Sequence, residues 1–195
     1  MSRTTTGHSI RVLPATADRW SDLVAVMGTR GDPSWCWCQY YRLRGQAWRD
    51  SSKSGNNKPA LREQVVSSKV PPGVIAYLDG EPAGWCAAGP KLGYPRLAAS
   101  RTMGGAVEGV WSVTCFVVRV EYRGRGIASE LLSGALDLAR THNASAVEAY
   151  PVDISQREKW RAAELFHGPL PLFINAGFTE VSRPSAARAV VRLDF

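Results

Sequence analysis

The sequence has little of several features that would define a function class. It contains no apolar run long enough to cross a bilayer, and residues 1–9 lack the apolar stretch of a secretion signal. It holds only four cysteines and three histidines, and the nearest pair, Cys36 and Cys38, does not have the spacing of a zinc knuckle. The other two, Cys86 and Cys115, lie on separate predicted strands. We therefore expect a cytoplasmic protein with reduced, buried thiols and no metal site.

Charge is the next constraint. The net charge of +7 at pH 7 suits nucleic acid, an acidic surface or a polyanionic small ligand. The arginines are scattered from Arg3 to Arg192 and form no runs, which counts against nucleic acid. With 45% hydrophobic and 21% charged residues, the chain is expected to fold as one domain over residues 1–195.

The spacing of apolar residues predicts a mixed α/β chain. Strands are expected at 10–13, 74–78, 82–88, 110–118, 146–150, 178–182 and 188–193, and helices at 17–27, 59–69, 127–142 and 170–176. The polar stretch 51–57 predicts a loop. Residues 89–109, rich in glycine and proline, predict a long functional or mobile excursion.

The most informative stretch is the strongest predicted strand, 110–118, followed by a basic turn and a helix. A helix that starts inside such a turn directs backbone N–H groups and the positive end of its dipole at one spot, which suits a phosphate. The P-loop pattern is absent, and a dinucleotide-binding turn would normally open its domain. A third pattern, Arg/Gln-x-x-Gly-x-Gly/Ala, is matched by Arg123, Gly126 and Ala128.

Together with the flanking strand and helix and with a later Phe-x-x-x-Gly-Phe at 173–178, this turn resembles the GNAT superfamily of acetyl-CoA-dependent N-acetyltransferases. The resemblance implies an α/β fold with a mixed, mostly antiparallel sheet flanked by helices. Residues 110–181 would form the acetyl-CoA-binding core, 10–109 a variable acceptor-side half, and 182–195 the closing strand. Segments such as Trp35-Cys36-Trp37-Cys38 are similar to a bacterial subgroup of unsettled substrate.

The resemblance also implies how acetyl-CoA would bind as co-substrate. The pantetheine arm would pair with main-chain groups of the strand 110–118, like an added strand, and the pyrophosphate would rest on the turn. Glycines there let the backbone approach closely, and the arginines add charge-assisted contacts. The residues expected to bind the cofactor are Phe116, Val118, Arg123, Gly124, Arg125, Gly126, Ile127, Ala128, Ser129 and Phe173.

The implied reaction is direct attack of an amine, on a small molecule or a protein, upon the thioester in a ternary complex. An alkylammonium has a pKa of about 10.4 and must first lose a proton. Where the family often has a tyrosine as acid, this chain has Phe173. Tyr150 and Asp153 are therefore the expected catalytic residues, with His167, more naturally a capping or surface residue, and Glu108 as further candidates. Glu148 is expected to be a paired strand carboxylate.

Several alternatives stay open. The aromatic segment Trp35–Trp48 could pack against the sheet, form the wall of an amine site or stack on nucleic-acid bases. Arg96 and Arg101 could attract an acidic acceptor. A catalytically weak acetyl-CoA-binding or sensor module is the first rival function, favoured by Phe173, and a basic nucleic-acid-binding protein is the second. No membrane partner is expected, and a homodimer is left open.

Overall fold

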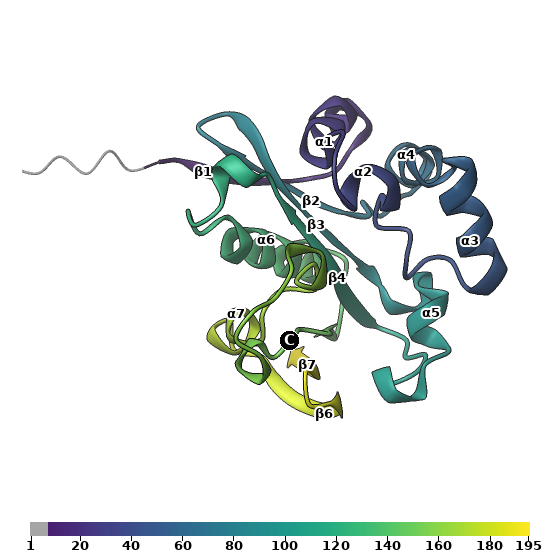
Figure 1. Ribbon diagram of the computed structural model, residues 1–195, viewed down its shortest axis with the longest axis vertical. Helices are drawn as coiled ribbons and strands as arrows, with labels where there is room; N and C mark the ends of the chain where they lie inside the picture. Colours follow the sequence, from purple (N-terminus) through teal and green to yellow (C-terminus); the bar gives the residue numbers. More distant parts are fainter. Residues whose placement is uncertain (1–7) are drawn as a thin grey trace, which may run out of the picture.

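The computed structural model describes residues 8–195 and is built on one seven-stranded sheet (Figure 1). Its strands are β1 (Ile10–Pro14), β2 (Gly73–Leu78), β3 (Glu81–Pro90), β4 (Val110–Val118), β5 (Ala146–Ala149), β6 (Thr179–Ser185) and β7 (Arg188–Asp194). The strand order is β1-β2-β3-β4-β5-β7-β6, and every neighbouring pair is antiparallel except β4 and β5. The predicted mixed, mostly antiparallel sheet is confirmed.

Helices cover both faces of the sheet, because its central strands are apolar on both sides. The helices are α1 (Trp20–Met27), α2 (Pro33–Cys36), α3 (Gly45–Ser54), α4 (Asn57–Ser67), α5 (Pro95–Ala98), α6 (Ile127–Thr141) and α7 (Leu170–Asn175). Along β2, Val74 and Ala76 face the core under α6, whereas Ile75 joins Trp85 in the core under α1 and α4 (Figure 1). None of the helices in residues 8–195 is long and apolar enough to cross a membrane.

One predicted loop is wrong. The stretch 51–57 belongs to helices α3 and α4, which are separated only by Gly55 and Asn56, and Gly55 ends α3 with a φ of +76°. Its serines, glycine and asparagines are typical of a loop, yet residues 51–54 form the last turn of α3. The long excursion predicted at 89–109 is present as the connection between β3 and β4, and it carries α5 and buries Lys91 and Leu97.

The neighbouring strands β4 and β5 separate halfway along β4. Strand β5 pairs only with Val110–Val113 and ends at Ala149, while β4 continues to Val118. On its other side β4 stays paired with β3 along most of its length. One edge of residues 114–118 is therefore left without a strand partner among the described residues, and the basic turn follows directly from that end.

Candidate functional site

A cavity of about 1520 Å³ opens where β4 and β5 separate. Its wall is formed by residues 114–118 of β4, the basic turn, the loop after α1, part of the aromatic segment and residues 165–169. Pockets for a single small ligand usually measure roughly 300–1,000 Å³. This cavity therefore has room for two reactants, one at the basic turn and one at the aromatic end.

The basic turn is shaped by two glycines in the left-handed region. Gly124 has a φ of +73° and Gly126 a φ of +80°, and a Cβ added to either would meet no atom within 4 Å. The glycines are needed here for the backbone conformation, and the space beside them is open. Gly126 caps the fifteen-residue helix α6, whose first N–H groups have no partner within the helix. This end of the cavity is suited to an anion.

Most of the residues predicted to bind the cofactor lie together on the cavity wall. They are Phe116, Val118, Arg123, Gly124, Gly126, Ile127, Ala128 and Ser129. Arg125 and Phe173 do not line the cavity. Arg125 is exposed, and Phe173 is fully buried with its ring 6.0 Å from that of Phe116. The motif predicts these two residues at the site, but neither contributes to the cavity wall.

The exposed edge of β4 already has hydrogen-bond partners within the chain. The Phe116 N–H donates to the carbonyl of Phe166 at 2.6 Å, and the Val118 carbonyl accepts from Arg123 Nε at 3.2 Å. The segment 165–169 thus occupies part of the β4 edge that is predicted to pair with pantetheine. A ligand can pair with the Phe116 N–H only if this segment moves away from β4.

Tyr150 lies beneath the cavity wall and not on it. Its side chain is fully buried, and its hydroxyl is 3.0 Å from Ser112 Oγ. Burial raises the pKa of Tyr150 above that of a free tyrosine, so the phenol stays protonated. The sequence predicts Tyr150 as the last residue of the strand 146–150, whereas β5 ends one residue earlier and the Tyr150 ring lies in the core beside Tyr41. The geometry does not support Tyr150 as a group that touches the substrate.

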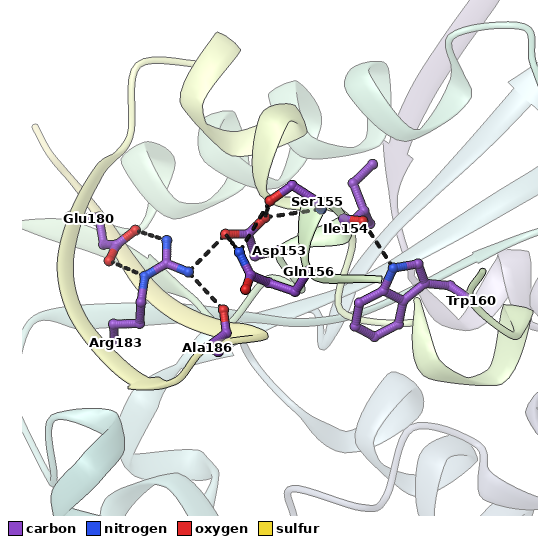
Figure 2. Close-up of polar contacts among 8 residues, drawn as sticks. All are labelled: Asp153, Ile154, Ser155, Gln156, Trp160, Glu180, Arg183 and Ala186. Atoms are coloured by element: carbon purple, nitrogen blue, oxygen red, sulfur yellow. Dashed lines mark hydrogen bonds and ion pairs between the residues drawn. The ribbon is translucent and has the colours of Figure 1, made fainter. Parts of the chain in front are cut away.

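Asp153 also lies outside the cavity wall, in a polar network shown in Figure 2. Its Oδ1 accepts from the N–H and hydroxyl of Ser155, and its Oδ2 is 2.8 Å from Arg183 Nη1, which belongs to β6. These hydrogen bonds lower the pKa of Asp153 to about 2. A carboxylate held in this way is a weak base, so Asp153 is a structural residue at the start of its loop.

Unlike Tyr150 and Asp153, His167 lies on the cavity wall. It was expected at the surface, yet its side chain is only 4% exposed. Its Nε2 is 2.5 Å from the hydroxyl of Tyr41, which also lines the cavity. Its Nδ1 has no hydrogen-bond partner among the described residues. Burial and the charge of Arg188 hold the pKa of His167 well below its ordinary value. The imidazole is therefore neutral at physiological pH.

The buried imidazole predicts a pH-dependent stability. The unfolded chain binds a proton at His167 below about pH 6.5, whereas the folded protein does not until its lower pKa is reached. The free energy of unfolding that comes from the neutral His167 is therefore fully present above pH 6.5. It is lost as the pH falls toward the folded-state pKa, at up to ~1.4 kcal/mol per pH unit. We expect His167→Gln to remove this slope in urea denaturation between about pH 5 and 7. An equal slope in the variant would contradict the assignment.

The aromatic segment divides between the wall and the core. Trp35, Tyr40 and Trp48 line the cavity, and the ring of Trp48 is 5.9 Å from Trp35 and 5.5 Å from Tyr40. Trp37 is buried and stacks on Trp20 in the core under α1. Arg96 fixes the segment, since its guanidinium lies over the Tyr40 ring and donates to the Tyr40 carbonyl. One part of the segment therefore packs in the core and another part lines the cavity.

The cysteines supply apolar surface. Cys38 and Cys86 are buried as predicted, while Cys36 and Cys115 are half-buried on the cavity wall. The nearby Cys38 thiol and burial raise the pKa of Cys115 well above its usual value, so it stays protonated and is a poor nucleophile. Within the described residues there is no cluster of three or more histidine, cysteine or acidic side chains that could hold a metal ion.

The remaining acidic candidates lie away from the cavity. Glu108 is exposed and does not line it. Glu148 is buried, with its Oε2 at 2.5 Å from Lys91 Nζ and its Oε1 at 3.3 Å from Arg192 Nη1. The prediction of a paired strand carboxylate is confirmed. Neither partner could be predicted, because Lys91 is 57 positions and Arg192 44 positions away in the sequence.

The comparisons with known proteins give a consistent result. The family model described as acetyltransferase (GNAT) family matches residues 35–165. The PaiA N-acetyltransferase from Thermoplasma acidophilum, solved in complex with coenzyme A, is 11% identical, with a TM-score of 0.54, over 96% of this chain and 99% of that one. The GNAT domain of PAT from S. lividans is 18% identical, with a TM-score of 0.54, over 95% and 90%. No curated protein matches the chain.

Proposed function

The chain belongs to the GNAT acetyltransferase family, and from that membership we propose that it transfers an acetyl group from acetyl-CoA to a primary amine of a small molecule or protein, by direct attack in a ternary complex. One observation carries the proposal. A single cavity joins an anion-suited turn at Arg123–Ser129 to an aromatic end at Trp35, Tyr40 and Trp48, along the edge of β4. Acetyl-CoA and the acceptor amine can thus be bound in the same cavity at the same time.

The residues present fit a coenzyme A group at the turn. The open space beside Gly124 and Gly126 admits a pyrophosphate close to the backbone, and the α6 N-terminus faces it. Arg123 adds a positive charge. The T. acidophilum structure of the same fold was solved with coenzyme A, which supports this assignment. When bound, acetyl-CoA supplies the activated acetyl group as a thioester.

The chain's own part in the reaction is mainly positioning. Residues 114–118 would align the thioester, and the aromatic end would orient the amine. Tyr150 and Asp153 lie off the cavity wall, and His167 is too weakly basic to take a proton from an ammonium. In this proposal the amine binds unprotonated, its nitrogen forms the bond to the acetyl carbon as the C–S bond breaks, and it then gives one of its two N–H protons to solvent, from which the thiolate can be protonated. With Phe173 buried in the core, the thiolate leaves without a tyrosine acid at that position.

The experiment is a calorimetric titration of the protein with acetyl-CoA, with NAD and a short DNA duplex as controls. We expect binding in the micromolar range for acetyl-CoA alone, as is usual for enzyme substrates. Release of coenzyme A in the presence of an amine panel then tests turnover. Binding of NAD or DNA in place of acetyl-CoA would overturn the assignment of the turn.

A second function is favoured by the residue at position 173. Phe173 is fully buried and stands where the family often has a tyrosine acid. A site without that acid fits a module that binds acetyl-CoA and does not turn it over. Tight acetyl-CoA binding with no coenzyme A release from any amine in the panel would select this function.

A further inference from the structure

Among the arginines on the cavity wall, Arg188 is half-buried and has no acidic partner among the described residues, whereas the other unpaired ones, Arg30 and Arg123, are exposed. Arg188 is the first residue of β7, is half-buried and lines the aromatic end of the cavity. Its Nη1 donates to the carbonyl of Tyr150 at 2.8 Å, and it forms no ion pair within residues 8–195. Arginine stays charged at physiological pH and has five N–H donors, so most of its hydrogen-bonding capacity remains available.

A second arginine on the same hairpin shows the contrast. Arg183 of β6 does not line the cavity and is bound by two carboxylates, with Nη1 at 2.8 Å from Asp153 and Nη2 at 2.6 Å from Glu180 (Figure 2). A partly buried charge without a counter-ion is unfavourable, and proteins usually supply one. Of these two hairpin arginines, the one without a carboxylate partner is Arg188, which is half-buried on the cavity wall, so its counter-ion can come with a ligand.

The groups around Arg188 support an anionic ligand group. His167 and Tyr41 line the cavity together with Arg188, and the buried Nδ1 of His167 has no partner among the described residues. The cavity wall contains only two acidic side chains in the part of the chain that the structure describes, Asp32 and Glu121. Glu121 is held by Arg119, at 2.6 Å, beside the basic turn. Asp32 accepts a hydrogen bond from Trp35 Nε1 at 3.3 Å, so the aromatic end holds a single acidic side chain, which is too few for a substrate with several positive charges.

We propose that Arg188 binds a carboxylate of the acceptor, so that the substrate is an amine that also carries a carboxylate, as amino acids do. This inference rests on the proposed acetyl transfer. A guanidinium can hold a carboxylate with two parallel hydrogen bonds, which orients the acceptor as well as binding it. Trp35, Tyr40 and Trp48 would enclose the rest of the molecule, and the amine would lie toward residues 114–118.

The test uses matched acceptors that differ only in the carboxylate. The twenty amino acids are compared with their decarboxylated amines, for example L-phenylalanine with 2-phenylethylamine and L-lysine with 1,5-diaminopentane. We expect kcat/KM to be about 10- to 100-fold higher for the best carboxylated acceptor than for its matched amine. Arg188→Gln should abolish this preference, Arg188→Lys should keep part of it, and Arg183→Gln, which removes a charge that does not line the cavity, should leave it unchanged.

Binding gives an independent readout. The fluorescence of Trp35 and Trp48 should respond to the carboxylated acceptors in the presence of coenzyme A, and this response should be lost in Arg188→Gln. Equal use of both members of each pair, or a preference that persists without Arg188, would overturn the inference. So would the absence of binding by every carboxylated acceptor while acetyl-CoA still binds. Loss of acetyl-CoA binding itself would instead overturn the proposed function.

Discussion

Replacing Gly126 with glutamate is expected to weaken acetyl-CoA binding by about 100-fold, or ~2.7 kcal/mol. Gly126 caps α6 and lines the cavity, and a side chain there would extend into open space beside the proposed pyrophosphate site. A carboxylate in that space faces the phosphates with a like charge, which costs several kcal/mol in a binding site. Calorimetric titration with acetyl-CoA measures the loss directly.

The matched control is Gly126→Gln, which has the same size and no charge. Because Gly126 has a φ of +80°, any side chain there strains the backbone, by about 1–3 kcal/mol. Glutamine and glutamate share this strain, so the difference between the two variants isolates the charge. Equal affinities in the two variants would show that no phosphate lies at this turn. The unfolding free energies of both variants should fall by similar amounts.

Replacing Lys91 with methionine is expected to lower the free energy of unfolding by about 3–5 kcal/mol. The Lys91 side chain is fully buried, and its Nζ is 2.5 Å from Glu148 Oε2 and 3.0 Å from the Met103 carbonyl. Methionine leaves the buried Glu148 with only Arg192, at 3.3 Å, as a charged partner. Urea denaturation at neutral pH gives the change in unfolding free energy.

Two further variants separate the charge from the packing. Lys53→Met, on the exposed surface of α3, should change the unfolding free energy by no more than about 0.5 kcal/mol. The double variant Lys91→Met with Glu148→Met should recover much of the single loss, because apolar residues can replace a buried pair at little cost. A single-variant loss below about 1 kcal/mol, or no recovery in the double variant, would contradict this account of the pair.

The parts of the fold that could be predicted from the sequence are those encoded by neighbouring residues. Strand β4, the turn at Arg123–Ser129 and helix α6 follow each other directly, so their order and role on the cavity wall were predictable. The site's other end depends on residues far apart in the chain. His167 meets Tyr41 over 126 positions, and no local pattern marks either one.

The positions of Tyr150 and Asp153 off the cavity wall have physical causes. Tyr150 lies on the opposite face from Val147 and Ala149, as the alternation along β5 predicts, but that face is covered by Tyr41 and Tyr94, which come from distant parts of the chain. Asp153 was chosen for its position near the expected cleft, yet it caps its own loop and pairs with Arg183 of β6. Such pairing depends on the path of a distant hairpin, which spacing in the sequence does not show.

The bond between the Phe116 N–H and the Phe166 carbonyl has a kinetic consequence. The segment 165–169 competes with any ligand for this edge of β4, because its Phe166 carbonyl already accepts the Phe116 N–H. Only the fraction of molecules in which that segment has released is competent to pair there, so the apparent affinity is reduced by that fraction. Association then proceeds more slowly than encounter by diffusion alone, since it waits for the segment to open.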